Sequence, residues 1–178
     1  MTDWTKDKSW ERGQLVEAQR FKRLMSLIDP DIKEATREEQ YQHIDWHTCI
    51  GTVDVKAMKR VSRNGSLQNE LVWVEFRNIA GRNGWLFGDQ KWVALEIPEG
   101  FIFVITKDLL ELANKLCDTD TFVHSAKGAL YKAYQRRGKG DVISMIKMDD
   151  VKTLSHFTIM DASLAPVIKT DAKDSAFI

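Results

Sequence analysis

Five segments with the composition of β-strands follow one another between residues 41 and 106, and they constrain the fold of this chain more than any other feature. They are rich in Val, Ile, Phe and Trp and are separated by short polar connections. We expect strands over Tyr41–Ile50, Gly51–Lys59, Leu71–Ile79, Trp92–Glu96 and Phe101–Thr106. Because a sheet must bury at least one face, the segments on either side have to cover it.

Helical periodicity appears on both sides of this run of strands. From Trp10 to Ile28 apolar residues recur at the spacing of a helix, and Asp29-Pro30 ends the pattern. Further elements are expected as helices over Ile32–Glu39, Lys107–Cys117 and about Ser125–Arg137, and as a last strand over Val142–Lys147. This order of elements predicts an α/β (α+β) domain.

The composition excludes several classes of protein. A length of 178 residues suits a single domain, and 43% hydrophobic with 29% charged residues is typical of a soluble globular chain. No apolar stretch approaches the roughly 20 residues of a membrane-spanning helix, and the N-terminal residues form no apolar leader. We therefore expect a cytoplasmic protein that makes no membrane contact, with one domain over residues 1–165 and a weakly ordered tail over 166–178.

The strand Gly51–Lys59 has an unusual charged face. Alternate residues of a strand point to the same side, so Val53 and Val55 share one face while Asp54 and Lys56 share the other. A carboxylate inside an otherwise apolar strand, flanked by a basic group on the same face, indicates a functional residue. Ordinary solvated surface is the alternative interpretation.

Glu75 and Arg77 share one face of the strand Leu71–Ile79 in the same way. The dipeptide Asn64-Gly65 between the two strands favours a hairpin, and a two-residue turn there would place Asp54 directly opposite Glu75. Opposed carboxylates repel unless a divalent cation lies between them, and their hard oxygen atoms suit Mg²⁺ or Mn²⁺. A bulge in so long a hairpin would change this register.

A third carboxylate, Glu17, falls at the centre of the apolar stripe of the first helix, in line with Phe21, Leu24 and Ile28. A carboxylate at such a position must be paired, capped or bound to a metal ion. A buried Glu bonded to a backbone group or to an Arg remains the alternative.

An Asp on one strand, an acid followed two residues later by a base on the next, and an upstream helix Glu together resemble the PD-(D/E)XK nuclease superfamily. The resemblance implies a restriction-endonuclease-like core, with a central mixed sheet flanked by helices. It implies that Asp54, Glu75 and Glu17 hold Mg²⁺ or Mn²⁺. Arg12-Gly13-x-x-x-Glu17 is similar to the helix motif of archaeal-type Holliday junction resolvases. Residues 43–88 also resemble small tailed-phage proteins of unknown role, which implies a phage protein in the host cytoplasm.

The same resemblance implies metal-dependent hydrolysis of DNA phosphodiester bonds, with branched or recombination intermediates as candidate substrates, and a homodimer. Arg77 stands where the family has its lysine, and Lys56 on the neighbouring strand is the other candidate for that catalytic charge. Two alternatives stay open. One is an RNA substrate, and the other is a catalytically inactive module on the same fold that binds nucleic acid or a protein partner.

Charge is balanced over the whole chain, with 26 basic and 26 acidic residues, but it is not evenly distributed. Residues 56–63 and 121–140 contain no carboxylate. We expect their basic side chains to contact nucleic acid: Lys59, Arg60, Arg63, Lys132, Arg136, Arg137 and Lys139. A solvated basic helix end is the alternative for the second group. His43 and Asp45, on the first expected strand, are candidates for the outer part of the same cleft.

Overall fold

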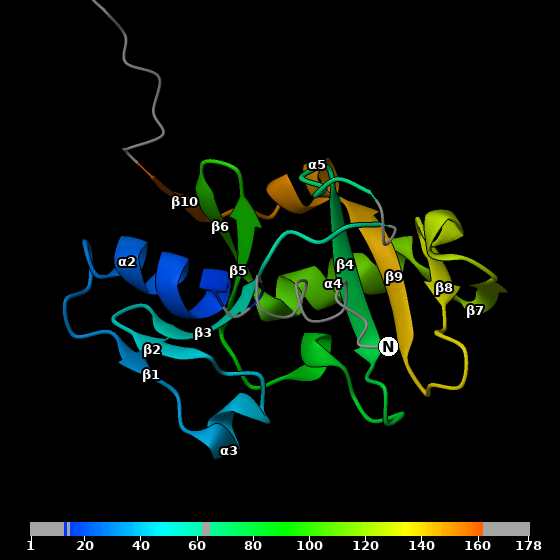
Figure 1. Ribbon diagram of the computed structural model, residues 1–178, viewed down its shortest axis with the longest axis horizontal. Helices are drawn as coiled ribbons and strands as arrows, with labels where there is room; N and C mark the ends of the chain where they lie inside the picture. Colours follow the sequence, from blue (N-terminus) through cyan, green and yellow to red (C-terminus); the bar gives the residue numbers. More distant parts are fainter. Residues whose placement is uncertain (1–12, 14, 62–64, 162–178) are drawn as a thin grey trace, which may run out of the picture.

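The computed structural model describes residues 13, 15–61 and 65–161, and it shows an α+β fold in which strands predominate (Figure 1). The strands form two sheets instead of the expected single central one. The first sheet contains, in spatial order, β1 (Lys33–Glu34), β2 (Trp46–Thr48), β3 (Gly51–Lys56), β5 (Trp92–Ile97), β6 (Gly100–Ile105) and β10 (Phe157–Met160). The second contains β4 (Leu71–Arg77), β9 (Val142–Lys147), β8 (Lys132–Tyr134) and β7 (Asp118–Val123).

Both sheets are mixed. In the first, β3 runs parallel to β5, and in the second, β7 runs parallel to β8, while all other neighbours are antiparallel. The helical elements are short: a π-helical turn Leu15–Arg20 that continues into α2 (Phe21–Met25), then α3 (Arg37–Gln40), α4 (Thr106–Leu116), α5 (Met148–Lys152) and 3₁₀ turns at Trp85–Phe87 and Ala126–Gly128. None of the described helices is long and apolar enough to cross a membrane.

The predicted hairpin between the strands that carry Asp54 and Glu75 does not form. β3 pairs with β2 and β5, whereas β4 pairs with β9 in the other sheet. Between the two strands, the described residues form an isolated bridge of Arg60 with Leu67, which is not in the predicted register, and Asn64 lies outside the described residues. The chain between β3 and β4 therefore crosses from one sheet to the other, because β3 gains two partners within its own sheet.

The helix expected over Ser125–Arg137 is also wrong. This segment contains one 3₁₀ turn and then β8, which pairs with β7 and β9. Tyr131 adopts a left-handed backbone conformation (φ 56°), which a helix cannot contain. The strand Val142–Lys147 and the helix near Lys107–Cys117 are confirmed, the latter as α4.

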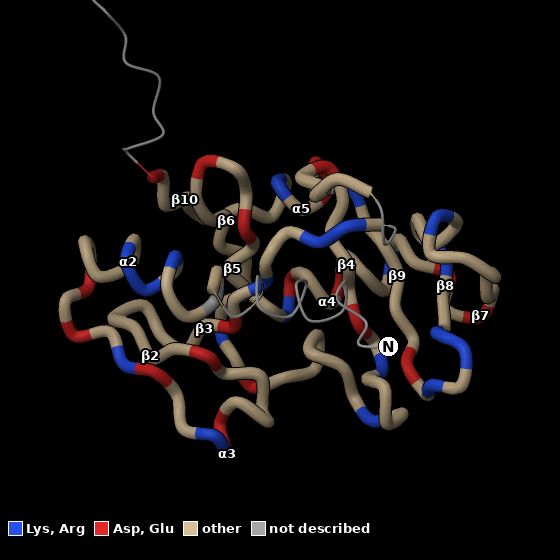
Figure 2. The backbone as a smooth tube through the Cα atoms, in the orientation of Figure 1, with Lys and Arg blue, Asp and Glu red and all other residues tan. Residues whose placement is uncertain are grey.

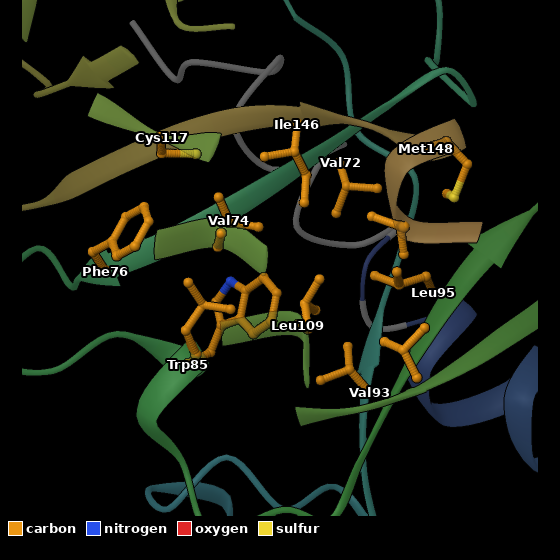
Figure 3. Close-up of a cluster of buried hydrophobic side chains, with 14 of the residues drawn as sticks. Val72, Val74, Phe76, Trp85, Val93, Leu95, Leu109, Cys117, Ile146 and Met148 are labelled. Carbon is orange, nitrogen blue, oxygen red and sulfur yellow. The ribbon is translucent and has the colours of Figure 1, made fainter. Parts of the chain in front are cut away.

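A large apolar cluster lies between the two sheets and α4 (Figure 3). Val74 and Ile146 contribute from β4 and β9, Val93 from β5, and Leu109 from α4, and all four are buried. Each such side chain stabilises the fold by about 1.5–3 kcal/mol relative to an exposed position. This layer joins the two sheets into one body.

A second apolar cluster lies on the opposite face of the first sheet, beneath α2. Val53 and Val55 of β3 belong to it together with Phe21 of α2, so the predicted alternation of β3 is confirmed. Because Val53 and Val55 point toward α2, Asp54 points the other way, toward the space between the sheets.

Candidate functional site

The hairpin of β2 and β3 brings two carboxylates together. Its antiparallel register pairs Trp46 with Val53. Asp45 comes directly before β2 and Asp54 directly after Val53, and the charge of Asp45 acts on Asp54. The Asp45 backbone N–H donates to the Val53 carbonyl at 2.9 Å, and the Asp45 Oδ2 accepts from the Val55 N–H at 2.7 Å. The Asp45 carboxylate is therefore held beside Asp54 by the backbone of the same hairpin.

Asp54 is buried, with 1% of its surface exposed. Its Oδ1 accepts from the Lys56 ammonium at 2.6 Å, while its Oδ2 has no hydrogen-bond partner among the described residues. Burial raises the pKa of Asp54 well above its usual value. The charge of Lys56 and its hydrogen bond to Asp54 oppose this shift in pKa. Asp45 adds to the shift through its charge and by accepting a hydrogen bond from the protonated Asp54 carboxyl. When both acids are ionised, Asp45 can offer only another acceptor, so the Asp54 Oδ2 stays unsatisfied.

Lys56 lies between the two sheets. Besides its contact with Asp54, its ammonium lies 5.5 Å from the centroid of the Trp85 ring, in a cation–π arrangement. Trp85 comes from the 3₁₀ turn after β4 and is buried in the cluster between the sheets. A basic group beside Asp54 is thus present on β3 itself.

Glu75 reaches this region from β4, in the second sheet. Burial raises its pKa, while the charge of Lys56 and the backbone N–H of Trp85 oppose that shift. A Cβ atom on Gly84 would lie 2.8 Å from the Glu75 Cγ and 2.2 Å from the Glu75 carbonyl oxygen, so only glycine fits there. Glu75 is therefore near Lys56, but it does not face Asp54 across a strand pair.

The other predicted site residues lie in different surroundings. Arg77 is exposed at the end of β4. His43 is half-buried in a left-handed turn (φ 64°), and burial lowers its pKa, an effect that the Lys56 charge strengthens and Asp45 opposes. Glu17 lies in the π-helical turn, but its side chain is outside the described part of the structure.

The predicted nucleic-acid contacts fall into separate groups. Lys59 follows β3 and Arg136 follows β8, and the charges of both oppose the rise in the pKa of Glu75. Arg60 precedes the crossing between the sheets, and Lys132 is exposed on β8. Arg137 and Lys139 are exposed in the turn between β8 and β9, whereas Arg63 lies outside the described residues.

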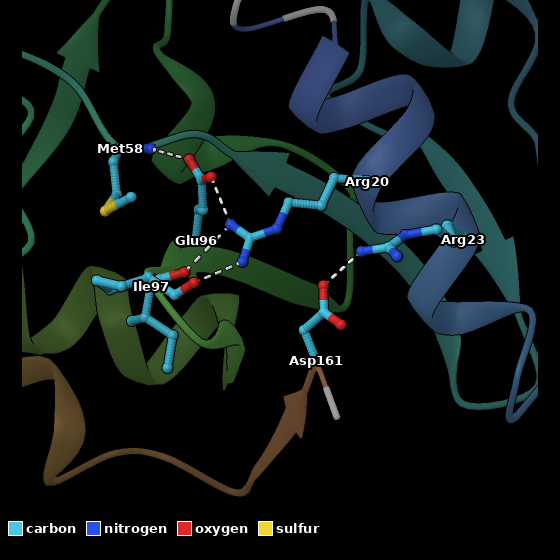
Figure 4. A network of polar contacts seen from close by, with 7 residues as sticks. Arg20, Arg23, Met58, Glu96, Ile97 and Asp161 are labelled. Atoms are coloured by element: carbon cyan, nitrogen blue, oxygen red, sulfur yellow. Dashed lines mark hydrogen bonds and ion pairs between the residues drawn. The ribbon is translucent and has the colours of Figure 1, made fainter. Parts of the chain in front are cut away.

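A network of polar contacts fixes the chain that follows Lys56 (Figure 4). Glu96 of β5 accepts from the Arg20 guanidinium at 2.6 Å and from the Met58 N–H at 2.8 Å. Arg20 also donates to the carbonyl oxygens of Ile97 and Pro98. This network ties the helical N-terminal segment, the end of β3 and β5 together.

The chemistry of the site follows from the carboxylate pair. Within the described ranges, no group of three or more His, Cys, Asp or Glu side chains gathers as a metal site. Mg²⁺ is often held by only one or two carboxylates, with water and substrate phosphates completing the shell. Asp45 and Asp54 therefore fit a divalent cation, because the buried, unsatisfied Oδ2 of Asp54 offers a hard oxygen ligand.

Sequence reasoning placed Asp45 at the edge of the site, whereas the structure places it beside Asp54. The glycine at position 51, after the two-residue connection Cys49-Ile50, was the signal that could have indicated this pairing, because glycine favours the positive φ that Gly51 adopts there (121°). Comparison of the chain with known protein families, curated proteins and solved structures finds no match.

Proposed function

We propose that this protein is a metal-dependent nuclease that hydrolyses DNA phosphodiester bonds, with Asp45, Asp54 and Lys56 at its centre. The observation that carries the proposal is the buried Oδ2 of Asp54, which has no hydrogen-bond partner among the described residues and lies beside a second carboxylate. A buried polar atom without a partner is costly, and a bound cation removes that cost.

The arrangement also supports the resemblance to the PD-(D/E)XK superfamily, with a different assignment of residues. The family pattern has an acid on one strand and an acid and a lysine two residues apart on the next. Asp45, directly before β2, and Asp54-Val55-Lys56 of β3 meet this pattern closely. The hairpin is that of β2 and β3, one strand earlier than the sequence pattern suggested. In this assignment Lys56 is the family lysine, and Arg77 has no catalytic role.

In this assignment each residue has its own role in phosphodiester hydrolysis. Asp45 and Asp54 would hold Mg²⁺ or Mn²⁺. When bound, the cation would polarise the scissile phosphate and lower the pKa of a bound water. The Lys56 ammonium would stabilise the negative charge that develops on the phosphate oxygens. Glu75 and His43 flank the centre.

The test is cleavage of plasmid, linear and four-way-junction DNA in Mg²⁺, in Mn²⁺ and in EDTA. We expect cleavage only with metal, and its loss in Asp45→Asn and Asp54→Asn. Asp149→Asn on α5 is the matched control, because this carboxylate is 88% exposed and forms a surface ion pair with Lys152. The proposal fails if the wild type does not cleave, or if cleavage survives both site substitutions.

The ion pair of Lys56 and Asp54 favours a second candidate function, a catalytically inactive module that binds nucleic acid. The ammonium already offsets the Asp54 charge at 2.6 Å, so a stable site without metal is chemically reasonable. Calorimetric titration with Mn²⁺ separates the two functions. Binding that Asp54→Asn abolishes supports the nuclease, and an absence of binding in the wild type supports the inactive module.

A further inference from the structure

Two turns without carboxylates meet at one end of the second sheet. They are the turn that follows β4 (residues 78–84) and the turn between β8 and β9 (residues 135–140). The Gly140 N–H donates to the Ile79 carbonyl at 3.1 Å, and a Cβ on Gly140 would lie 2.9 Å from the Gly81 nitrogen. Only a residue without a side chain permits this approach, so the two turns are closely packed.

This end of the sheet is basic. We define the basic rim as five exposed residues: Arg77, Arg82, Arg136, Arg137 and Lys139. Residues 77–84 and 135–140 contain no Asp or Glu. Figure 2 shows the blue segments of both turns at the same end of β4 and β9. Such a surface attracts the phosphates of a nucleic acid strand.

A buried acid orients one member of the basic rim. Asp141, which is fully buried, accepts from the Arg136 backbone N–H at 3.3 Å and from its Nε at 2.5 Å. Contact through Nε leaves the two terminal amino groups of a half-exposed guanidinium to bind an oxyanion. Because the Arg136 charge also acts on Glu75, the rim adjoins the candidate site.

Two aromatic side chains lie on the outer face of the same sheet. Val74 of β4 and Ala133 of β8 point into the core, so their neighbours Trp73 and Tyr134 point outward. Both rings are half-buried, with centroids 6.5 Å apart and planes tilted by 49°. Glu75 shares this face with Trp73, and the charges of Lys56 and Arg136 both act on Glu75.

We propose that this outer face binds an unpaired segment of DNA, with phosphates on the basic rim and bases stacked on Trp73 and Tyr134. Stacking on aromatic side chains requires exposed base faces, which a single strand offers and a duplex hides. The position of this strand beside the cut rests on the proposed nuclease function. The substrate would then be DNA with a single-stranded segment next to the cleaved bond, and not an intact duplex.

The test measures binding of fluorescent single-stranded and duplex oligonucleotides of equal length by anisotropy, in EDTA and over a series of KCl concentrations. We expect the single strand to bind about 10-fold more tightly than the duplex. Trp73→Leu should weaken single-strand binding by about 10-fold and leave duplex binding unchanged. Trp73→Phe keeps an aromatic ring and should retain most of the affinity for the single strand. This variant distinguishes a loss of stacking from a loss of the folded structure.

Arg136→Gln should weaken binding of both oligonucleotides and reduce the slope of log affinity against log salt by about one. Lys33→Gln is the matched control, because Lys33 is exposed on β1 of the other sheet. Equal affinity for single strand and duplex, or a Trp73→Leu protein that melts like the wild type and binds the single strand equally well, would overturn the proposal.

Binding in EDTA is independent of cleavage, so the two proposals fail separately. A single-strand preference in a wild-type protein that does not cleave supports the interface and refutes the nuclease. Metal-dependent cleavage without any single-strand preference supports the nuclease and refutes the interface.

Discussion

Two buried acids of the same sheet have opposite surroundings. Glu96 on β5 faces α2, is 3% exposed, and uses both carboxylate oxygens, one with Arg20 and one with Met58. Asp54, on the neighbouring strand β3, faces the other side and keeps one oxygen without a hydrogen-bond partner among the described residues. Burial alone therefore does not identify a functional carboxylate.

The difference lies in what each acid contributes. A buried carboxylate with all its partners stabilises the arrangement that surrounds it, and its removal leaves those partners unsatisfied. A buried carboxylate that lacks a partner lowers stability, and such local costs are expected at functional sites. On this basis Glu96 belongs to the framework and Asp54 to the site.

The largest expected effect is the loss of cleavage in Asp54→Asn. Removal of one oxygen ligand and its charge should reduce the cleavage rate by about 100- to 1,000-fold. Without metal, the Asp54→Asn variant should be at least as stable as the wild-type protein. Initial cleavage rates and guanidinium unfolding measure the two quantities. A variant that still cleaves at the wild-type rate would show that Asp54 is only structural.

Glu96→Gln should have the opposite effects: it should lower the stability of the protein and leave cleavage intact. The Arg20 guanidinium loses its charged partner, so we expect a loss of about 2 kcal/mol in the free energy of unfolding. Cleavage should persist well below the melting temperature. If this substitution abolishes cleavage in a fully folded protein, the division between framework and site is wrong.

A metal ion should stabilise only a chain with an intact site. At a free Mn²⁺ concentration ten times the dissociation constant, the gain is about 1.4 kcal/mol. Thermal melts should show this gain in the wild type and in Glu96→Gln, but not in Asp54→Asn. A gain of equal size in all three proteins would place the ion elsewhere.

The smallest expected effect is a dependence on pH. Because the pKa of Asp54 is raised in the folded protein, the unfolded chain releases this proton at a lower pH than the folded chain does. The metal-free protein should therefore lose stability as pH rises from the usual carboxyl pKa through the raised one. Glu75 acts in the same direction.

Unfolding in urea at a series of pH values, without metal, measures this dependence. The stability difference between Asp54→Asn and the wild type should increase with pH in favour of the variant. A difference that stays constant would mean that Asp54 titrates as it does in the unfolded chain.

Several parts of the fold could be predicted because they depend on local patterns. The alternation of β3 gave Asp54 and Lys56 a common face, and their 2.6 Å contact confirms it. The strand Val142–Lys147 was predicted with its observed bounds, because its ends are marked by polar or charged neighbours. The helix predicted over Ser125–Arg137 does not form, because pairing of β8 with β7 and β9 outweighs the local helical preference.

The sequence by itself therefore determined which residues of each strand share a face, since side chain alternation is a property of the single strand. It did not determine the partner of Asp54. The turn signal at Asn64-Gly65 pointed to Glu75, whereas the folded chain pairs β3 with β2 and β5 and sends β4 to another sheet. Strand pairing depends on contacts between residues far apart in the chain, so only the tertiary structure decided that Asp45 lies beside Asp54.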